Sequence, residues 1–361
     1  MRRQLLILGF AALAVLAWLG AACRSPVPAE PRYGWVAGNS ADGYGTILHT
    51  TDYGETWVRQ GNASTIPGAA LNSVSAADDE NVWAVGDNWA DVGQSYGTIL
   101  RTTDGGQTWT RQGGAASVPD VELSGVSAVS SRVAWAVGWE GVILKTTDRG
   151  QTWTRQAEGM FPLGQGMTVS AWDEDVAWVA SQDSSTAGPA LILHTTDGGA
   201  TWTREGQDSL PAHTGLIDVH AASATVAWVV GMNYSCFRTT DAGQHWYRAL
   251  PQAGLDHING VCALDEQAAW LAADNAWAYF TPDAGDSWVK RRTPGGGAYC
   301  PNLGVTALNA DTAWMTQTSV GPGLILGTFD RGATWTVRLR TDSAGLGNIG
   351  LRGITFAGAV R

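Results

Sequence analysis

Short apolar runs separated by turn residues recur along the chain. Between residues 123 and 156, four of them follow one another: LSGVSAV, RVAWAVG, GVILKTTD and TWTRQ. Runs of β-branched and aromatic residues bounded by Gly, Ser and Asp are typical of short strands joined by tight turns. The second and third runs show little alternation, which indicates strands covered on both faces. We label the four predicted strands a, b, c and d.

The four-strand unit repeats, and its most regular part is an eight-residue motif at the junction of strands c and d. The motif has the pattern S/T-x-D-x-G-x-x-W, and its copies begin at residues 50, 102, 146, 195, 239, 281 and 328. Successive copies lie 42 to 52 residues apart, which fits the length of one β-propeller blade. Because a propeller adds blades to one closed ring, a chain of 361 residues can form a single domain.

We predict that the motif folds a tight hairpin between strands c and d. Its Asp is suited to accept hydrogen bonds from the turn's own amides, its Gly can adopt positive φ, and its Trp can turn back into the blade core. Seven such turns around a ring hold their carboxylates too far apart for paired acid–base chemistry, which needs about 5 to 10 Å. The motif residues are Asp52, Gly54, Trp57, Asp104, Gly106, Trp109, Asp148, Gly150, Trp153, Asp197, Gly199, Trp202, Asp241, Gly243, Trp246, Asp283, Gly285, Trp288, Asp330, Gly332 and Trp335.

A second tryptophan recurs in strand b, where it precedes small or apolar residues, as in WAVG. The strand-b and motif tryptophans together account for 14 of the 19 in the chain, so the high tryptophan content is architectural. The strand-b tryptophans are Trp35, Trp83, Trp135, Trp178, Trp228, Trp270 and Trp314.

The two ends of the repeat region predict how the ring closes. Residues 33–38 form a strand b with no strand a before it, and residues 351–357 form a strand a with nothing after it. Paired side by side, these segments complete one blade and remove an open sheet edge. We therefore predict an all-β, seven-bladed β-propeller over residues 33–361, with four antiparallel strands per blade and one blade shared between N- and C-terminal strands.

The segment before the ring has the pattern of an export signal. Residues 1–22 combine two arginines, an apolar stretch and small residues before Cys23, which predicts a lipoprotein-type signal peptide. The stretch LGAAC is similar to a lipobox, although Gly20 stands where Leu, Val or Ile is usual, and plain secretion or an uncleaved anchor are the alternatives. Lipidation of Cys23 would tether the ring to the outer side of a bacterial membrane through the Pro-rich residues 23–32.

Composition argues against several kinds of partner and site. Acidic residues number 33 and basic residues 22, a formal net charge of −11, whereas a nucleic-acid partner requires a basic face. The sequence has no C-x-x-C pair and no phosphate-binding loop, and we predict no cofactor and no metal. Cys236, Cys262 and Cys300 are expected as buried thiols, with Cys262 and Cys300 the preferred pair if one disulfide forms. We expect a monomer.

The motif resembles the Asp box, or BNR repeat, of bacterial sialidases. The longer unit WAVGWEGVILKTTDRGQTW, residues 135–153, resembles the repeat of the photosystem II stability and assembly factor family, which has many relatives in non-photosynthetic bacteria. This resemblance covers nearly all of residues 33–361. It implies an exported or lipid-anchored propeller without an active site, which in photosynthetic members assists assembly of a membrane protein complex. The motif is specific for the fold and says little about function.

A binding site is expected on the top face of the ring, which we define as the face formed by the b–c and d–a connections. These loops differ most between repeats, and a rigid scaffold commonly carries function on such loops. Aromatic residues outside the repeat positions are candidate anchors for a protein partner or a sugar, with Trp139 and Glu140 the first choice. The alternative is that they only cap the ends of blades. The top-face candidates are Trp89, Tyr96, Trp139, Glu140, Phe161 and Tyr299.

Two functions stay open at this point. The favoured one is a non-catalytic scaffold that binds a protein partner and assists assembly or stability of a membrane or envelope complex. The alternative is a glycan-binding or glycan-cleaving surface protein, for which Asp87, Asp91 and Glu140 are the obvious top-face carboxylates. The RIP segment that precedes the first Asp box of sialidases is missing here, and xyloglucan-cleaving enzymes resemble two facing propellers rather than one.

Overall fold

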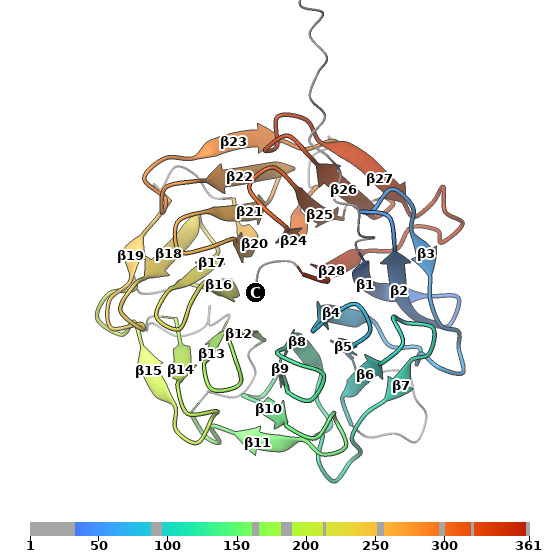
Figure 1. Ribbon diagram of the computed structural model, residues 1–361, viewed down its shortest axis with the longest axis horizontal. Helices are drawn as coiled ribbons and strands as arrows, with labels where there is room; N and C mark the ends of the chain where they lie inside the picture. The colour runs from blue at the N-terminus through green and yellow to red at the C-terminus, as the bar shows by residue number, and fades with distance from the viewer. Residues whose placement is uncertain are drawn as a thin grey trace, which may run out of the picture. The chain divides into compact units, whose positions relative to one another are not determined.

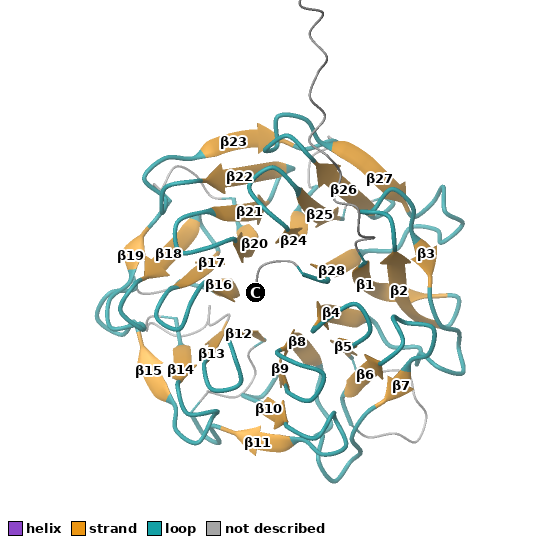
Figure 2. Ribbon diagram, viewed as in Figure 1, coloured by secondary structure: helices purple, strands orange, loops and turns teal. Residues whose placement is uncertain are grey.

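The protein is described by a computed structural model that covers residues 33–87, 96–160, 166–181, 190–211, 214–250, 256–295, 300–318 and 321–358. Within these ranges every regular element is a β-strand (Figure 2). The described part of the chain contains no helix long and apolar enough to span a membrane. Residues 1–32, which include the predicted signal peptide, Cys23 and the tether, lie outside the described ranges.

The strands form seven four-stranded antiparallel sheets arranged as blades around a ring (Figure 1). We number the blades from the one that holds the chain's first strand. From the inner to the outer strand, blade 1 is β28 (Leu351–Phe356), β1 (Gly34–Ala41), β2 (Tyr44–Thr50) and β3 (Val58–Arg59); blade 2 is β4 (Leu71–Ala76), β5 (Val82–Gly86), β6 (Thr98–Thr102) and β7 (Thr110–Arg111); blade 3 is β8 (Leu123–Ala128), β9 (Ala134–Gly138), β10 (Ile143–Thr146) and β11 (Thr154–Gln156).

The remaining four blades follow the same order. Blade 4 is β12 (Met167–Ala171), β13 (Ala177–Ser181), β14 (Ile192–Thr195) and β15 (Thr203–Glu205); blade 5 is β16 (Leu216–Ala221), β17 (Ala227–Gly231), β18 (Ser235–Thr239) and β19 (Tyr247–Arg248); blade 6 is β20 (Ile258–Ala263), β21 (Ala269–Ala273), β22 (Trp277–Thr281) and β23 (Val289–Arg292); blade 7 is β24 (Asn302–Ala307), β25 (Ala313–Gln317), β26 (Leu324–Thr328) and β27 (Thr336–Arg340).

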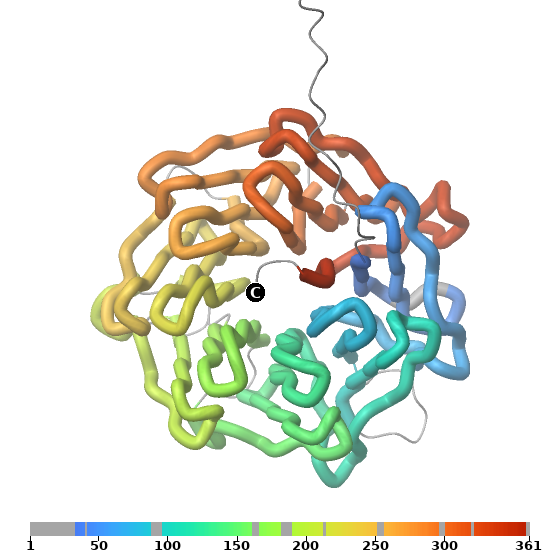
Figure 3. The backbone as a smooth tube through the Cα atoms, viewed as in Figure 1, coloured from blue at the N-terminus to red at the C-terminus, as the bar shows by residue number. Residues whose placement is uncertain are grey.

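The ring closes through blade 1, where the last strand of the chain lies beside the first. β28 pairs antiparallel with β1, with Gly34 opposite Phe356 and Val36 opposite Ile354. The smoothed trace shows the two ends of the colour range meeting in this blade (Figure 3). The predicted seven-bladed propeller and its shared blade are therefore confirmed.

Six of the seven inner strands share a shift in their pairing with strand b. In six blades the pairing between inner strand and strand b shifts by one residue near the start of the inner strand, which is the signature of a β-bulge. Only β12 of blade 4 pairs without a shift, because the segment MTVSA is one residue shorter than its counterparts, such as LSGVSA. In these six blades the bulge lies at the top-face end of the inner strand.

The apolar core lies mainly between blades. All seven strand-b tryptophans are at most 1% exposed. In five neighbouring pairs of blades, the Asp-box tryptophan lies edge-on to the strand-b tryptophan of the preceding blade, with ring centroids 5.6 to 6.3 Å apart. Between blades 7 and 1, Phe356 takes part instead, stacked on Trp314 at 3.9 Å and edge-on to Trp57. The motif tryptophan thus packs at the blade interface rather than in the core of its own blade.

Hydroxyl groups add a second link between neighbouring blades. Ser75, Ser127 and Ser170 each occupy the next-to-last position of an inner strand, and each Oγ accepts the amide of an alanine in the next inner strand at 3.0 Å. Thr355 does the same for the Ala76 amide at 3.4 Å, across the junction that closes the ring. These bonds satisfy backbone donors that the blade's own sheet leaves unpaired.

An Asp-box glycine such as Gly150 has a left-handed backbone and also lies against a tryptophan of the preceding blade. A matched pair of substitutions separates these two requirements. Gly150 has φ +83°, and a Cβ there would lie 2.7 Å from the Trp83 ring of the preceding blade; Gly159 has φ +75° with open space around it. Gly159→Ala should lower the free energy of unfolding by roughly 1 to 2 kcal/mol, the cost of left-handed backbone. Gly150→Ala should cost about 1 to 3 kcal/mol more, because the blade interface is overpacked. Urea unfolding measures both, and equal losses would contradict the proposed role of the interface.

Candidate functional site

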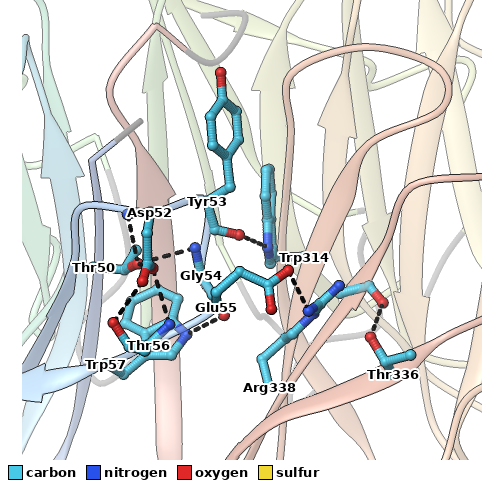
Figure 4. Close-up of polar contacts among 11 residues, drawn as sticks. Thr50, Asp52, Tyr53, Gly54, Glu55, Thr56, Trp57, Trp314, Thr336 and Arg338 are labelled. Carbon is cyan, nitrogen blue, oxygen red and sulfur yellow. Dashed lines mark hydrogen bonds and ion pairs between the residues drawn. The ribbon is translucent and has the colours of Figure 1, made fainter. Parts of the chain in front are cut away.

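Each Asp box is a closed hydrogen-bonded turn. In blade 1, the Thr50 hydroxyl donates to Asp52 Oδ1 at 2.8 Å and accepts the Gly54 amide at 2.9 Å (Figure 4). Asp52 also accepts from the amide and the hydroxyl of Thr56, at 2.9 and 2.6 Å. The other six boxes repeat these contacts, with His245 or Ser287 in place of the second threonine in two of them.

The box carboxylates are consequently occupied by their own turns. The Thr201 hydroxyl and amide hydrogen-bond to Asp197 and lower its pKa to about 2. At neutral pH this aspartate is therefore ionised, and its oxygens accept hydrogen bonds from its own turn. The box also contacts the neighbouring blade: Trp314 of blade 7 donates its indole N–H to the Tyr53 carbonyl at 3.1 Å, and Arg338 pairs with Glu55 (Figure 4). The geometry makes the Asp boxes structural joints.

Cations and histidines at the repeat position in strand c also serve the blade junctions. Lys145 lies 4.5 Å above the Trp135 ring and donates to the carbonyls of Glu174 and Gly198 in blade 4, both at 2.8 Å. His194 stacks on Trp178 at 3.7 Å, and burial lowers its pKa to about 4. Ring stacking and hydrogen bonds within the ring therefore account for these groups.

The inner strands line a central channel of about 690 Å³. Its wall is formed largely by serine, threonine, glycine and small apolar residues of β4, β8, β12, β16, β20, β24 and β28, which surround the ring centre in Figure 1. We call its end at the b–c and d–a connections the mouth. The mouth consists of Asn39, Asn72, Asp87, Glu122, Trp139 and Arg352.

A hydrogen-bond network joins the mouth residues of blades 1, 2 and 3. Arg352 on the closing strand β28 donates through Nε to Asn39 Oδ1 at 3.0 Å and through Nη1 to Asn72 Oδ1. Asn72 Nδ2 in turn lies 2.9 Å from Asp87 Oδ1, 3.2 Å from Glu122 Oε1 and 2.9 Å from the Leu123 carbonyl. The network therefore places two carboxylates around one amide nitrogen.

The electrostatics of the mouth centre on Glu122. Burial and the nearby Asp87 carboxylate raise the pKa of Glu122, against opposing contributions from the Trp139 side chain, Arg352 and Asn72. The Trp139 amide also donates to the Glu122 carbonyl at 3.0 Å, so this tryptophan is held to Glu122 through both backbone and side chain. The Trp139 side chain nevertheless remains 40% exposed.

The predicted top-face residues lie in different surroundings, and three of them fall outside the described residues. Trp139 is at the mouth, whereas Glu140 is an exposed residue of the b–c turn with φ +59° and is not among the residues that line the channel. Tyr96 is half-buried, with the Arg111 guanidinium 4.1 Å above its ring and bonded to its carbonyl. Trp89, Phe161 and Tyr299 lie outside the described residues.

Sequence reasoning missed Asn72, Glu122 and Arg352. Asn72 and Arg352 occupy the second position of their inner strands, where the other blades carry Ser124, Thr168, Ile217, Asn259 and Leu303. This position varies in chemistry, whereas the position before it is Leu, Ile or Met in six of the seven blades. Variability within the repeat unit was the signal that could have identified the mouth.

The described residues do not bring together the carboxylates considered for glycan cleavage or a set of metal ligands. Of the carboxylates considered for glycan cleavage, Asp87 is bound to Asn72 beside Glu122, Glu140 lies apart from the channel lining, and Asp91 lies outside the described residues. Among the described residues, no three His, Cys, Asp or Glu side chains are arranged to hold a metal ion.

The cysteines are thiols rather than a disulfide pair. Cys236, Cys262 and Cys300 are free and buried, as expected, and the pair named in case a disulfide formed, Cys262 with Cys300, is not bonded. Burial raises the pKa of Cys262 to about 12 and also raises the pKa of Cys236. Thiols with raised pKa values are poor nucleophiles at neutral pH.

Comparison with known families decides the relationship. The family described as Photosynthesis system II assembly factor YCF48 matches residues 88–185 and 206–355, more than half of the chain. The chain belongs to the YCF48 family. The resemblance inferred from the repeat unit is thereby confirmed.

Individual relatives of the YCF48 family are distant. The chain is 30% identical over 80 residues to the Photosystem II assembly lipoprotein Ycf48 of Synechococcus sp. (strain CC9902), a match that spans 22% of this chain and only 20% of that protein. A solved structure described as YCF48 bound to D1 peptide is 19% identical, with a TM-score of 0.59 over 80% of this chain and 91% of that one. YCF48 from Cyanidioschyzon merolae is 17% identical, with a TM-score of 0.59 over 84% and 97%.

The fold is also shared with enzymes. A GH74 xyloglucanase from Xanthomonas campestris is 14% identical, with a TM-score of 0.57 over 84% of this chain and 46% of that chain. At this level of identity, the likeness concerns the fold alone.

One channel-wall carboxylate predicts a pH dependence of stability. Asp218 on β16 accepts from the Thr168 hydroxyl, the Val219 amide and, across the blade junction, the Val261 amide at 2.9 Å, yet burial raises its pKa from 3.8 to about 6. The folded state therefore holds this proton more tightly than the unfolded state, and the associated stability is complete below pH 3.8 and is lost as pH rises to about 6.

Asp218→Gly should remove that contribution, because glycine is the residue found at this position in blades 3, 6, 7 and 1. Thermal unfolding of both proteins between pH 4 and 7 measures the effect. The variant's melting temperature should rise relative to that of the unmodified protein as pH increases through this window. Parallel curves would contradict the assignment, and Asp218→Asn, which keeps the side-chain volume, controls for the loss of packing.

Proposed function

We propose that this protein is a non-catalytic, exported propeller that binds a polypeptide partner at the mouth and thereby assists assembly or stability of a membrane or envelope protein complex. Membership of the YCF48 family supports the proposal, as does the description of one family structure as bound to D1 peptide. The observation that carries it here is Trp139, a 40% exposed tryptophan held at the rim of a concave surface. A rigidly held, exposed aromatic side chain is the usual anchor of a protein interface.

The rigidity of the site favours binding over catalysis. Trp139 is fixed through its amide and side chain to Glu122. The b–c turn that carries it is short, running only from Trp139 to Val142, with positive φ at Glu140 and Gly141. A partner docking here would find the tryptophan already oriented, which lowers the entropic cost of binding. The Asp boxes, with their oxygens occupied, serve only to hold the blades.

Membrane anchoring is a further part of the proposal. The curated relative from Synechococcus is named a lipoprotein, which supports lipidation of Cys23 after removal of residues 1–22. Residues 23–32 would then tether the ring on the outer side of the membrane, in the periplasm or at the cell surface. Under this proposal the mouth acts on partners that are inserted in or exposed at the same membrane.

Crosslinking in intact cells followed by affinity isolation tests the proposed function. The unmodified protein is compared with Trp139→Ala and with Trp172→Ala, a matched control whose tryptophan is 36% exposed on the a–b turn of blade 4, at the opposite end of the channel. A membrane protein should be recovered with the unmodified protein and the control, and at least about tenfold less with Trp139→Ala, since an anchoring aromatic side chain contributes about 2 kcal/mol.

Two outcomes would contradict the proposal. Equal recovery with Trp139→Ala and Trp172→Ala would show that binding does not use the mouth. Recovery of no protein partner by any form would shift the favoured function to glycan binding, which a glycan array would then examine.

A further inference from the structure

The mouth places two carboxylates beside one amide nitrogen. Asn72 Nδ2 carries two hydrogens but faces three acceptors, namely Asp87 Oδ1, Glu122 Oε1 and the Leu123 carbonyl. The Trp139 side chain also hydrogen-bonds to Glu122, so three donor hydrogens serve these three acceptors. Two of the acceptors belong to carboxylates, each of which can accept about four hydrogen bonds, so both can accept further hydrogen bonds from a donor outside the chain.

Arg352, the one cation among the mouth residues, hydrogen-bonds to amide oxygens rather than to the two carboxylates. Arg352 donates to the amide oxygens of Asn39 and Asn72, and no ion pair within the described part of the chain joins it to Asp87 or Glu122. Through these bonds Arg352 ties the closing strand β28 to β1 and β4, so its geometry serves ring closure. With one arginine and two carboxylates, the ionised mouth carries a net negative charge.

Trp139 adds a face suited to a cation. Elsewhere the chain covers its tryptophans with its own basic residues, as Arg101 covers Trp83 at 5.0 Å and Lys145 covers Trp135 at 4.5 Å. No cation of the described residues lies over Trp139, although its ring borders the Glu122 carboxylate. A positive group that approached Glu122 would pass along the exposed indole, where cation–π attraction contributes.

We propose that the mouth recognises a basic side chain, arginine or lysine, of the polypeptide partner. Its guanidinium or ammonium group donates to Asp87 and Glu122 and lies against the Trp139 ring. The inference rests on the proposed function and deepens it by naming the chemistry of the residue that is bound. Charge complementarity commits the site to a cation, and the tryptophan favours an organic cation over a metal ion, for which the described residues of the mouth supply only two carboxylates.

Model peptides test the proposal on the full chain solubilised in detergent. The protein is labelled with 5-fluorotryptophan, and the Trp139 signal in the fluorine NMR spectrum is assigned by its loss in Trp139→Phe. The probes are acetylated, amidated Gly-Arg-Gly and Gly-Lys-Gly, with Gly-citrulline-Gly as a neutral probe of nearly the same shape as the arginine peptide. The arginine and lysine peptides should shift the Trp139 signal saturably, and the citrulline peptide should leave it unmoved.

Three substitutions locate the contact. Glu122→Gln and Asp87→Asn conserve shape and should weaken peptide binding at least tenfold. Glu140→Gln is the matched control, because it removes the same charge one residue from Trp139 at a side chain that is not part of the channel lining, and it should leave binding unchanged. The signals of the other tryptophans report whether each variant keeps its fold.

The outcomes separate this inference from the proposed function. It is overturned if the citrulline peptide shifts Trp139 as the arginine peptide does, if Glu122→Gln and Asp87→Asn both bind normally, or if Ca²⁺ alone displaces the arginine peptide. If the cellular partner is lost with Trp139→Ala yet retained with Glu122→Gln and Asp87→Asn, the scaffold function stands and the basic-residue inference fails. If Trp139→Ala retains the partner and no peptide shifts the Trp139 signal, both fail.

Discussion

The contact between an Asp box and the strand-b tryptophan of the preceding blade, made by six of the seven boxes, is the constraint on which the rest of the ring depends. Gly150 and Gly199 bring the turn so close that a Cβ would lie 2.7 and 2.9 Å from the Trp83 and Trp135 rings. The box tryptophan then closes the contact edge-on, as Trp153 does against Trp83 at 5.6 Å. Because single blades cannot bury their tryptophans alone, stability comes from the junctions, and a closed ring has no unpaired end.

The same contact explains why so regular a motif carries so little functional information. The carboxylate oxygens of the box aspartates accept hydrogen bonds within the turn that positions glycine and tryptophan, as Asp52 does from Thr50 and Thr56. A carboxylate saturated by its own turn has no capacity left for a ligand. Enzymes and assembly factors can therefore share this repeat, since what they share is the means of joining blades.

Much of the fold was predictable from sequence for the same reason. Strand order, blade number and closure through residues 33–38 and 351–357 follow from a repeat whose turns, strands and tryptophans are visible in the sequence. The partner of each tryptophan was not predictable, because Trp153 could reach its own blade core or the preceding blade, and spacing alone does not distinguish them. Of the candidate site, Trp139 was identified as an aromatic residue outside the repeat. Asn72 and Arg352 were not, since they are 280 positions apart in the chain and meet only when the ring closes.

A functional site in this ring is expected where a blade departs from the others. Asp218 stands where four other blades carry glycine and spans two blade junctions, and Arg352 is the one charged residue at the second position of an inner strand. Each departure carries a cost, such as the burial of the Asp218 carboxyl group or the proximity of the Asp87 and Glu122 carboxylates. Such costs are tolerated because the junctions, repeated around the ring, supply stability independently of any one position on the channel wall. The regular repeat builds a rigid frame, and the frame allows the mouth to hold charge and an exposed tryptophan in a fixed arrangement.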